Sequence, residues 1–215
     1  MLFRSGIASD IVLCAAGSLP SELHKLWRTE QAGGYHAEYG FSCMGYEIAG
    51  GLGVKMAEPS REVIVLVGDG SYLMLNSELA TSVMLGHKMI VVVLDNRGFS
   101  CINRLQNATG NRSFNNLLKD CQSVEDGHPE INFALHAKAL GAESEKVNNI
   151  QELASALGRA RSSSKSYLIS LVTDSHKISP EGGCWWEVAV PEISSNANSE
   201  MIYQAYKKAK TKQLY

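Results

Sequence analysis

The chain has 215 residues, of which 45% are hydrophobic and 20% charged, and its formal net charge is −2, from 20 Lys and Arg against 22 Asp and Glu. This composition is that of a globular protein and excludes fully disordered, collagen-like and coiled-coil chains. So small a net charge gives no basic field for nucleic acid or an anionic membrane, and no apolar run approaches the roughly 18 residues of a membrane-spanning helix. We therefore expect neither nucleic acid nor a membrane as a partner.

The cysteines and the first residues bear on the cellular compartment. The five cysteines are widely spaced and form no Cys-x-x-Cys pair, so we expect no disulfide framework and no zinc site. Residues 1–10 hold one arginine and are not followed by a long apolar stretch, unlike a secretory signal. Free thiols suit a reducing compartment, and we expect the protein to be cytoplasmic.

Short apolar runs alternate along the chain with segments of helical spacing. Buried strands are predicted at residues 11–15, 62–67, 89–94 and 167–172. Helices are predicted at residues 21–27, 44–57, 75–83, 132–140 and 150–161, with a lysine-rich helix or tail at 199–215. Residues 100–132 are polar and are expected to be irregular. This alternation predicts an α/β protein with a doubly wound, mostly parallel sheet, helices on both faces, and binding at the carboxyl ends of the strands.

The predicted helix at 44–57 contains four glycines, Gly45, Gly50, Gly51 and Gly53. Glycine weakens a helix because its backbone loses the most conformational freedom on folding. We therefore expect this helix to be held by close packing against another element.

Polar side chains follow two of the predicted strands. Gly68-Asp69-Gly70-Ser71 follows the second strand and Asn96 follows the third. If these strands are neighbours, the Asp69 carboxylate and the Asn96 amide reach the same crevice, where they would be hard-oxygen ligands suited to Mg²⁺. The glycines let the backbone approach a phosphate, and a helix opening at Gly70-Ser71 would favour an anion. The pattern predicts a diphosphate bridged by Mg²⁺.

A Gly-Asp-Gly turn at the end of a strand is common and by itself indicates no more than a turn. The addition of Asn96 at the end of a second buried strand favours the ligand site over this alternative.

Gly68-Asp69-Gly70 with Asn96 and Gly98 resembles the cofactor motif of thiamine diphosphate-dependent enzymes. In that family the Asp and Asn side chains bind Mg²⁺, and the backbone carbonyl two residues after the Asn completes the protein ligands. The resemblance therefore implies a metal site formed by Asp69, Asn96 and Gly98.

The glycine-rich stretch 41–45, followed by residues 49–53, resembles the segment beneath the cofactor in acetolactate synthase-like members of this family. There the residue at Met44 supports the bent cofactor; ordinary helix packing by Met44 is the alternative. Phe99 stands where the family has an aromatic residue after the Asn. The residues implied to bind the cofactor are Ser18, Ser42, Cys43, Met44, Gly45, Gly68, Asp69, Gly70, Ser71, Asn96, Gly98 and Phe99.

Longer strings at residues 35–51, 96–102 and 183–192 resemble a narrower group in the family, the ring-opening hydrolases of myo-inositol catabolism. This resemblance covers nearly all of the chain. It implies thiamine diphosphate and Mg²⁺ as cofactors, a small cyclic dione as substrate, and hydrolysis of a C–C bond in its ring.

The family has an N-terminal pyrimidine-binding domain, a central domain and a C-terminal pyrophosphate-binding domain, and this chain resembles only the last. We expect residues 1–190 to form the pyrophosphate-binding domain and residues 191–215 a C-terminal helical tail, with the other two domains absent. The family's glutamate that activates the aminopyrimidine ring lies in the N-terminal domain. No catalytic residue is therefore expected in this chain, and the chain alone is expected to be inactive.

Three functions stay open. The chain is part of the ring-opening hydrolase, or a cofactor-binding module that needs a partner chain for turnover, or an acetolactate synthase-like carboligase or decarboxylase. We expect a homo-oligomer with a pyrimidine domain from the same or another chain, because the glycine-rich face at 44–53 would otherwise be left uncovered.

Overall fold

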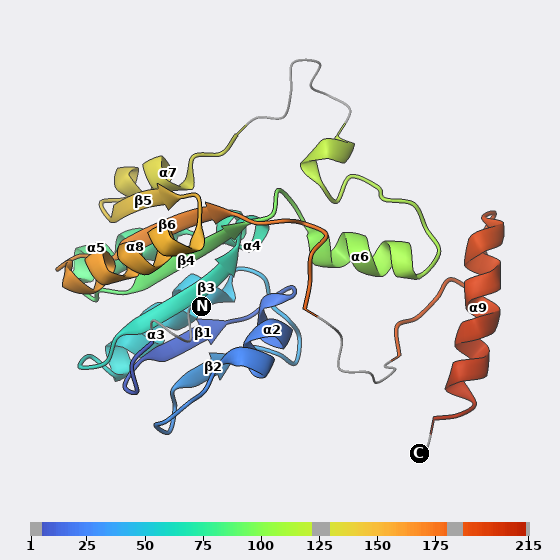
Figure 1. Ribbon diagram of the computed structural model, residues 1–215, viewed down its shortest axis with the longest axis horizontal. Coiled ribbons are helices and arrows are strands. Elements are labelled where there is room, and N and C mark those ends of the chain that lie inside the picture. The colour runs from blue at the N-terminus through green and yellow to red at the C-terminus, as the bar shows by residue number, and fades with distance from the viewer. Residues whose placement is uncertain (1–5, 122–129, 180–186, 214–215) are drawn as a thin grey trace. The chain divides into compact units, whose positions relative to one another are not determined.

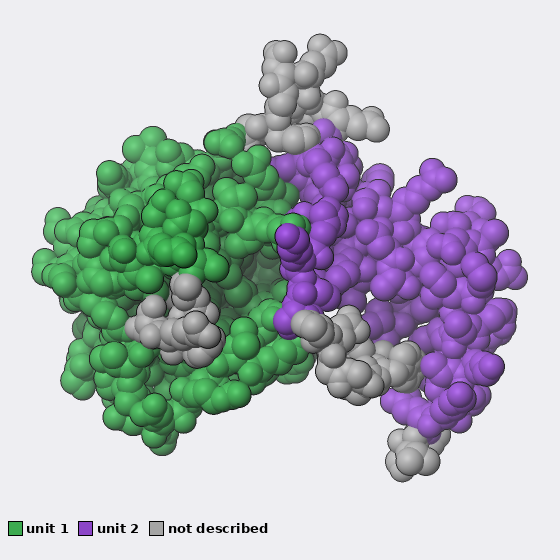
Figure 2. All heavy atoms as spheres, in the orientation of Figure 1, with its two compact units in different colours: residues 1–97, 129–174 green, residues 98–128, 175–215 purple. Residues whose placement is uncertain are grey.

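The computed structural model describes residues 6–121, 130–179 and 187–213. The chain folds into two compact units, which Figure 2 distinguishes by colour. The first comprises residues 1–97 and 129–174, and the second residues 98–128 and 175–215. Residues 183–186, including Trp185 and Trp186, lie outside the described part, so the structure does not bear on that portion of the third sequence string.

The first unit is built on a six-stranded, all-parallel sheet with the order β2-β1-β3-β4-β6-β5 (Figure 1). The strands are β1 (Ile11–Cys14), β2 (Tyr35–Ala37), β3 (Val63–Gly68), β4 (Ile90–Asp95), β5 (Glu143–Val147) and β6 (Tyr167–Val172). All four predicted strands are present, and the predicted doubly wound parallel sheet is confirmed. The edge strands β2 and β5 were not predicted, because β2 has three residues and β5 is mostly polar.

Helices cover both faces of this sheet (Figure 1). One face carries α2 (Leu19–Leu26) and α8 (Ile150–Ser162). The other carries α3 (Tyr46–Ala57), α4 (Asp69–Met74), α5 (Ser77–Leu85) and α7 (Phe133–Ala139). Residues of β3 alternate between the two cores and all of Val63–Val67 are buried, which is why this strand reads as a continuous apolar run.

The glycines of α3 allow the close packing that the sequence predicts. A Cβ atom at Gly51 would overlap the side chain of Val65 in β3, so this helix lies against the sheet at a distance that only glycine permits. Gly53, on the exposed side of the same helix, has open space around it. The packing of α3 thus depends on one glycine in particular.

One predicted helix begins later than expected, and one helix was not predicted. The helix predicted at residues 75–83 is present as α5 (Ser77–Leu85), but Leu75 precedes it as the C-cap of α4, with a φ of −152° and a ψ of 87°. Residues 100–132, expected to be irregular, begin with the helix α6 (Ser100–Ala108). Its buried residues are Ser100 and Asn103, so polar side chains occupy the inward positions and no apolar period reveals the helix.

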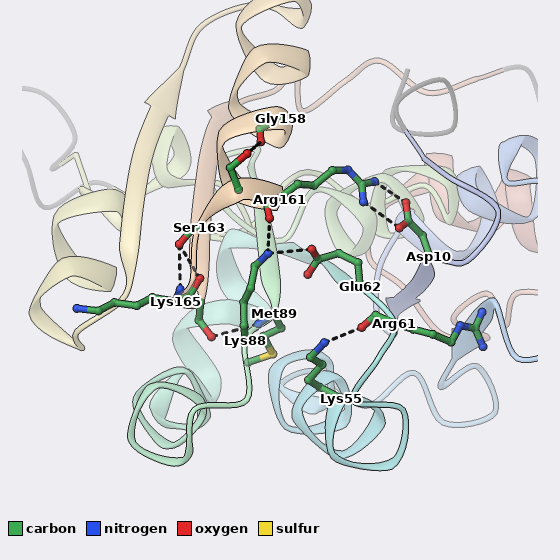
Figure 3. A network of polar contacts seen from close by, with 12 residues as sticks. Asp10, Lys55, Arg61, Glu62, Lys88, Met89, Gly158, Arg161, Ser163 and Lys165 are labelled. Carbon is green, nitrogen blue, oxygen red and sulfur yellow. Dashed lines mark hydrogen bonds and ion pairs between the residues drawn. The ribbon is translucent and has the colours of Figure 1, made fainter.

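Charged side chains form a network of ion pairs and hydrogen bonds at the edge of the sheet where the strands begin (Figure 3). Asp10, which precedes β1, accepts two hydrogen bonds from the Arg161 guanidinium of α8, at 2.9 and 2.5 Å. Lys88, which precedes β4, contacts Glu62 at 2.9 Å and donates to the Arg161 carbonyl, also at 2.9 Å. The Asp10 side chain is fully buried, and a buried, bidentate pair fixes the geometry of the groups it joins. These contacts tie α8 to the starts of three strands.

The second unit contains α6, a single 3₁₀ turn at Leu118–Asp120 and the helix α9 (Ala197–Lys210). Asn196 donates to the Gly110 carbonyl at 2.8 Å, and a Cβ at Gly110 would lie 2.7 Å from the Ser199 Cα. The start of α9 therefore packs on the loop after α6. In the described part of the chain no helix is both long and apolar enough to cross a membrane. The expected boundary between cofactor-binding domain and tail at residue 190 stays a prediction.

We predict that Gly51→Ala lowers the free energy of unfolding by about 1–3 kcal/mol, because the new methyl group overpacks against Val65. The matched control is Gly53→Ala in the same helix, where nothing is displaced and the better helix propensity of alanine adds about 0.5–1 kcal/mol. Urea denaturation of both variants measures the difference. Equal effects of the two substitutions would contradict the assigned packing.

Candidate active site: the carboxyl edge of the central strands

The candidate site residues of the first unit lie at the carboxyl edge of the sheet, at the point where the strand order reverses. From β1 the sheet continues to β2 on one side, and from β3 to β4 on the other. Helices α2 and α4 therefore leave β1 and β3 toward opposite faces, and ligands of open α/β sheets bind at such a reversal of strand order. The turn after β1, the start of α3 and the start of α4 all lie at this edge.

Asp69 and Asn96 are brought together, as their positions in the sequence predict. Gly68 pairs with Leu94 in the parallel register of β3 and β4, so the two following segments leave the sheet side by side. The Asn96 backbone N–H donates to Asp69 Oδ1 at 3.4 Å, and Asp69 is 6% exposed. Asp69 is the first residue of α4, one position earlier than the helix start expected at Gly70.

Gly98 is the first residue of the second unit and has a φ of +138°. Its backbone pairs with Leu117 in an isolated antiparallel bridge, and a Cβ there would overlap the Asn116 carbonyl. Phe99, which is exposed, donates its N–H to that carbonyl at 2.7 Å. The glycine is therefore required by the close approach of this backbone as well as by its φ.

The segment before α3 is a loop fixed by two carboxylates. Glu38 accepts hydrogen bonds from the backbone N–H groups of Cys43 and of Phe41, the latter at 3.0 Å. These donors, Cys43 first, hold the pKa of Glu38 below its ordinary value. Ser42 and Cys43 are exposed and Met44 is half-buried, so both the loop and the side chain expected to support the cofactor have access to solvent.

Glu47 is the second of these carboxylates, and the sequence reasoning did not assign it a role. It is completely buried in the first turn of α3. Its Oε1 accepts from the Ala16 N–H at 3.3 Å, and its Oε2 accepts from the Gly45 N–H at 3.1 Å and from the Ser71 hydroxyl at 2.7 Å. The only sequence signal was a charged residue inside an otherwise apolar, glycine-rich stretch.

Ser71 and Ser18 differ in how deeply they are buried. The Ser71 hydroxyl donates to Glu47 and accepts from the Gly45 N–H at 2.7 Å, within the protein interior. Ser18 precedes α2, is half-buried, and its carbonyl accepts from the Ser21 hydroxyl at 2.9 Å. Ser71 thus organises the site from beneath, whereas Ser18 lies nearer the surface of the same edge.

The oxygen atoms at this edge are of the kind that would bind a Mg²⁺–diphosphate ligand. A nearly buried carboxylate lies beside the backbone of an asparagine, and few protein oxygens suffice for Mg²⁺ because phosphate and water complete its octahedron. Across the described residues, no cluster of three or more His, Cys, Asp or Glu side chains could hold a metal, and the four cysteines of that part are free thiols.

The fold defines a doubly wound, parallel α/β domain whose candidate site lies where the strand order reverses, and comparison with known proteins identifies its family. The model of the thiamine pyrophosphate enzyme C-terminal TPP binding domain matches residues 15–171. The chain therefore belongs to this family, as the sequence motifs predict.

Among curated proteins, the chain is 41% identical over 199 residues to the 3D-(3,5/4)-trihydroxycyclohexane-1,2-dione hydrolase of Bacillus licheniformis, a match that covers 93% of this chain and 31% of that protein. It is 39% identical to the hydrolase of the same name from Halalkalibacterium halodurans, covering 91% of this chain and 30% of that protein. The chain thus spans about a third of the length of these relatives.

Among solved structures, a thiamine diphosphate-dependent 4-hydroxybenzoylformate decarboxylase of Rhodococcus jostii RHA1 superposes with a TM-score of 0.67 at 19% identity. The match covers 80% of this chain and 31% of that one. At this identity the likeness supports the fold alone.

We predict that Asp69→Ala weakens the Mg²⁺-dependent binding of thiamine diphosphate at least about 100-fold, because loss of a direct ligand exceeds the effect of losing an outer-shell partner. Isothermal titration calorimetry of the 215-residue chain measures this. The control is Glu58→Ala, which removes an exposed carboxylate at the far end of α3 and should leave the affinity unchanged. Undiminished binding by Asp69→Ala would show that the metal lies elsewhere.

Proposed function

We propose that this chain is the C-terminal, pyrophosphate-binding part of a thiamine diphosphate- and Mg²⁺-dependent hydrolase. The reaction is opening of the ring of 3D-(3,5/4)-trihydroxycyclohexane-1,2-dione by C–C bond hydrolysis, which gives 5-deoxyglucuronate. The observation that carries this proposal is the 41% identity, over nearly the whole chain, to a protein of that name.

Asp69 and Asn96 would hold Mg²⁺ through side-chain oxygens, and the Gly98 carbonyl would be the third protein ligand. The two residues directly follow β3 and β4, neighbouring parallel strands whose register brings their ends together. Gly68 and Gly70 leave room for a diphosphate beside this ion. Thiamine diphosphate, when bound, supplies the carbanion and the electron sink for C–C cleavage, while the protein binds and orients it.

The remaining site residues would shape the pocket around the cofactor. Met44 would support it, since a flexible apolar side chain adapts to an irregular surface. Ser42, Cys43 and Gly45 precede α3, Ser18 precedes α2, and Phe99 precedes α6. Ser71 would act through Glu47 and Gly45 rather than by direct contact, because its hydroxyl is engaged by both.

The complete enzyme would need a pyrimidine-binding domain, from the same or another chain, to supply the glutamate that activates the aminopyrimidine. We propose a homo-oligomer in the cytoplasm as the working assembly. A partner would also cover exposed apolar side chains of the first unit, since interaction sites are rich in exposed apolar groups; on α4, on its C-cap residue and on α5 these are Leu73, Met74, Leu75, Met84 and Leu85.

We predict that the 215-residue chain alone does not consume the trihydroxy dione, but that it restores turnover when it replaces the corresponding third of the Bacillus licheniformis relative. The physical reason is that the chain supplies the diphosphate and metal half of the site and lacks the activating carboxylate. The assay follows loss of the dione and appearance of 5-deoxyglucuronate.

The matched control is the same chimera carrying Asp69→Ala, which should fold and remain inactive. Robust cleavage by the isolated chain would show that the catalytic carboxylate had been misplaced. A chimera that acts on 2-oxo acids but not on the dione would instead favour the carboligase or decarboxylase function.

A further inference from the structure

The carboxylate of Glu47 lies at the crossing point of the chain segments that form the candidate site. Its three hydrogen-bond donors come from three segments: Ala16 after β1, Gly45 at the start of α3, and Ser71 in the first turn of α4. β1 and β3 are the two strands between which the sheet order reverses. One side chain therefore joins the segments that follow β1 and β3 to the start of α3.

These contacts offset the burial of a negative charge. An ionised carboxylate is costly to bury unless its oxygens are hydrogen-bonded. The donors to Glu47 are two backbone amides and a hydroxyl, all neutral. The positive end of the α3 dipole adds to their effect, because Glu47 lies in the first turn of that twelve-residue helix. An apolar residue could pack at this position without burying a charge. The carboxylate differs from it in the hydrogen bonds that it accepts from three segments.

The chain of contacts continues from Glu47 to the proposed metal ligands. Ser71 is two residues after Asp69 in α4, and Asp69 accepts from the Asn96 N–H. On the other side, Gly45 has a φ of +92°, and a Cβ there would lie 3.0 Å from the Leu75 Cβ. The backbone that follows Met44 is thus pressed against the α4–α5 connection and hydrogen-bonded to both Ser71 and Glu47.

From this geometry we propose that Glu47 is a positioning residue for the cofactor, acting with Ser71 to set the spacing between the Met44-Gly45 backbone and the Asp69 end of α4. The inference rests on the proposed function, because the ligand that this spacing serves is a Mg²⁺-bound diphosphate. Glu47 does not itself contact the ligand.

The test compares Glu47→Gln and Ser71→Ala with Ser82→Ala in the 215-residue chain. Ser82 is the matched control, since it is also buried and hydrogen-bonded, to the Leu79 carbonyl at 2.7 Å and to the Ser166 hydroxyl at 2.8 Å. Ser166 precedes β6, so this pair lies at the opposite edge of the sheet. Thermal unfolding of each variant checks that it folds, calorimetry gives the affinity for thiamine diphosphate with Mg²⁺, and hydrogen exchange of residues 43–46 reports the order of the loop.

We expect Glu47→Gln and Ser71→Ala to weaken cofactor binding about tenfold or more, as loss of an outer-shell partner does, and to speed exchange of the Gly45 amide. Ser82→Ala should lower the unfolding temperature comparably and change neither readout. Folded Glu47→Gln and Ser71→Ala variants with the parent's affinity and the parent's exchange would overturn the inference. If the parent itself does not bind the cofactor, the proposed function fails, and an unchanged Gly45 exchange in the variants would still refute the positioning role.

Discussion

The parallel register between β3 and β4 is the constraint on which the site depends. Because Gly68 pairs with Leu94, the residues that follow each strand emerge at the same edge, and a carboxylate and an asparagine far apart in sequence become neighbours. A shift of one strand by one residue would turn its buried side chains to the opposite core. The hydrophobic alternation that fills the two cores therefore also holds the proposed metal ligands in place.

The strand order reverses between β1 and β3, and the elements around this point are held by specific contacts as well as by apolar packing. Gly51 lets α3 approach the sheet, and Gly45 permits the positive φ of the turn before α3. Glu47 is hydrogen-bonded to the segments that follow β1 and β3. A site in which backbone and ligand must meet closely needs small residues. The glycine-rich segment is thus explained by packing and by ligand access together.

Sequence reasoning could predict the sheet and the ligand pair because each left a local signal. Central parallel strands are apolar throughout, and Asp69 and Asn96 directly follow two of them. β5 gave no such signal, since its sequence is Glu143-Ser144-Glu145-Lys146-Val147 and four of these five side chains reach solvent. The role of Glu47 was also hidden, because its three donors come together only through tertiary folding.

Charged side chains are paired differently at the two ends of the parallel strands. Where the strands begin, Asp10 with Arg161 and Glu62 with Lys88 form ion pairs within the protein, so those charges are already matched. Where the strands end, the Glu47 carboxylate is held by neutral donors, and the nearly buried Asp69 carboxylate lies beside the Asn96 backbone. Ion pairs within the protein fix the geometry of the groups they join, whereas carboxylate oxygens are ligands that suit Mg²⁺. The same sheet thereby separates the contacts that hold its fold from those that would receive a metal-bound ligand.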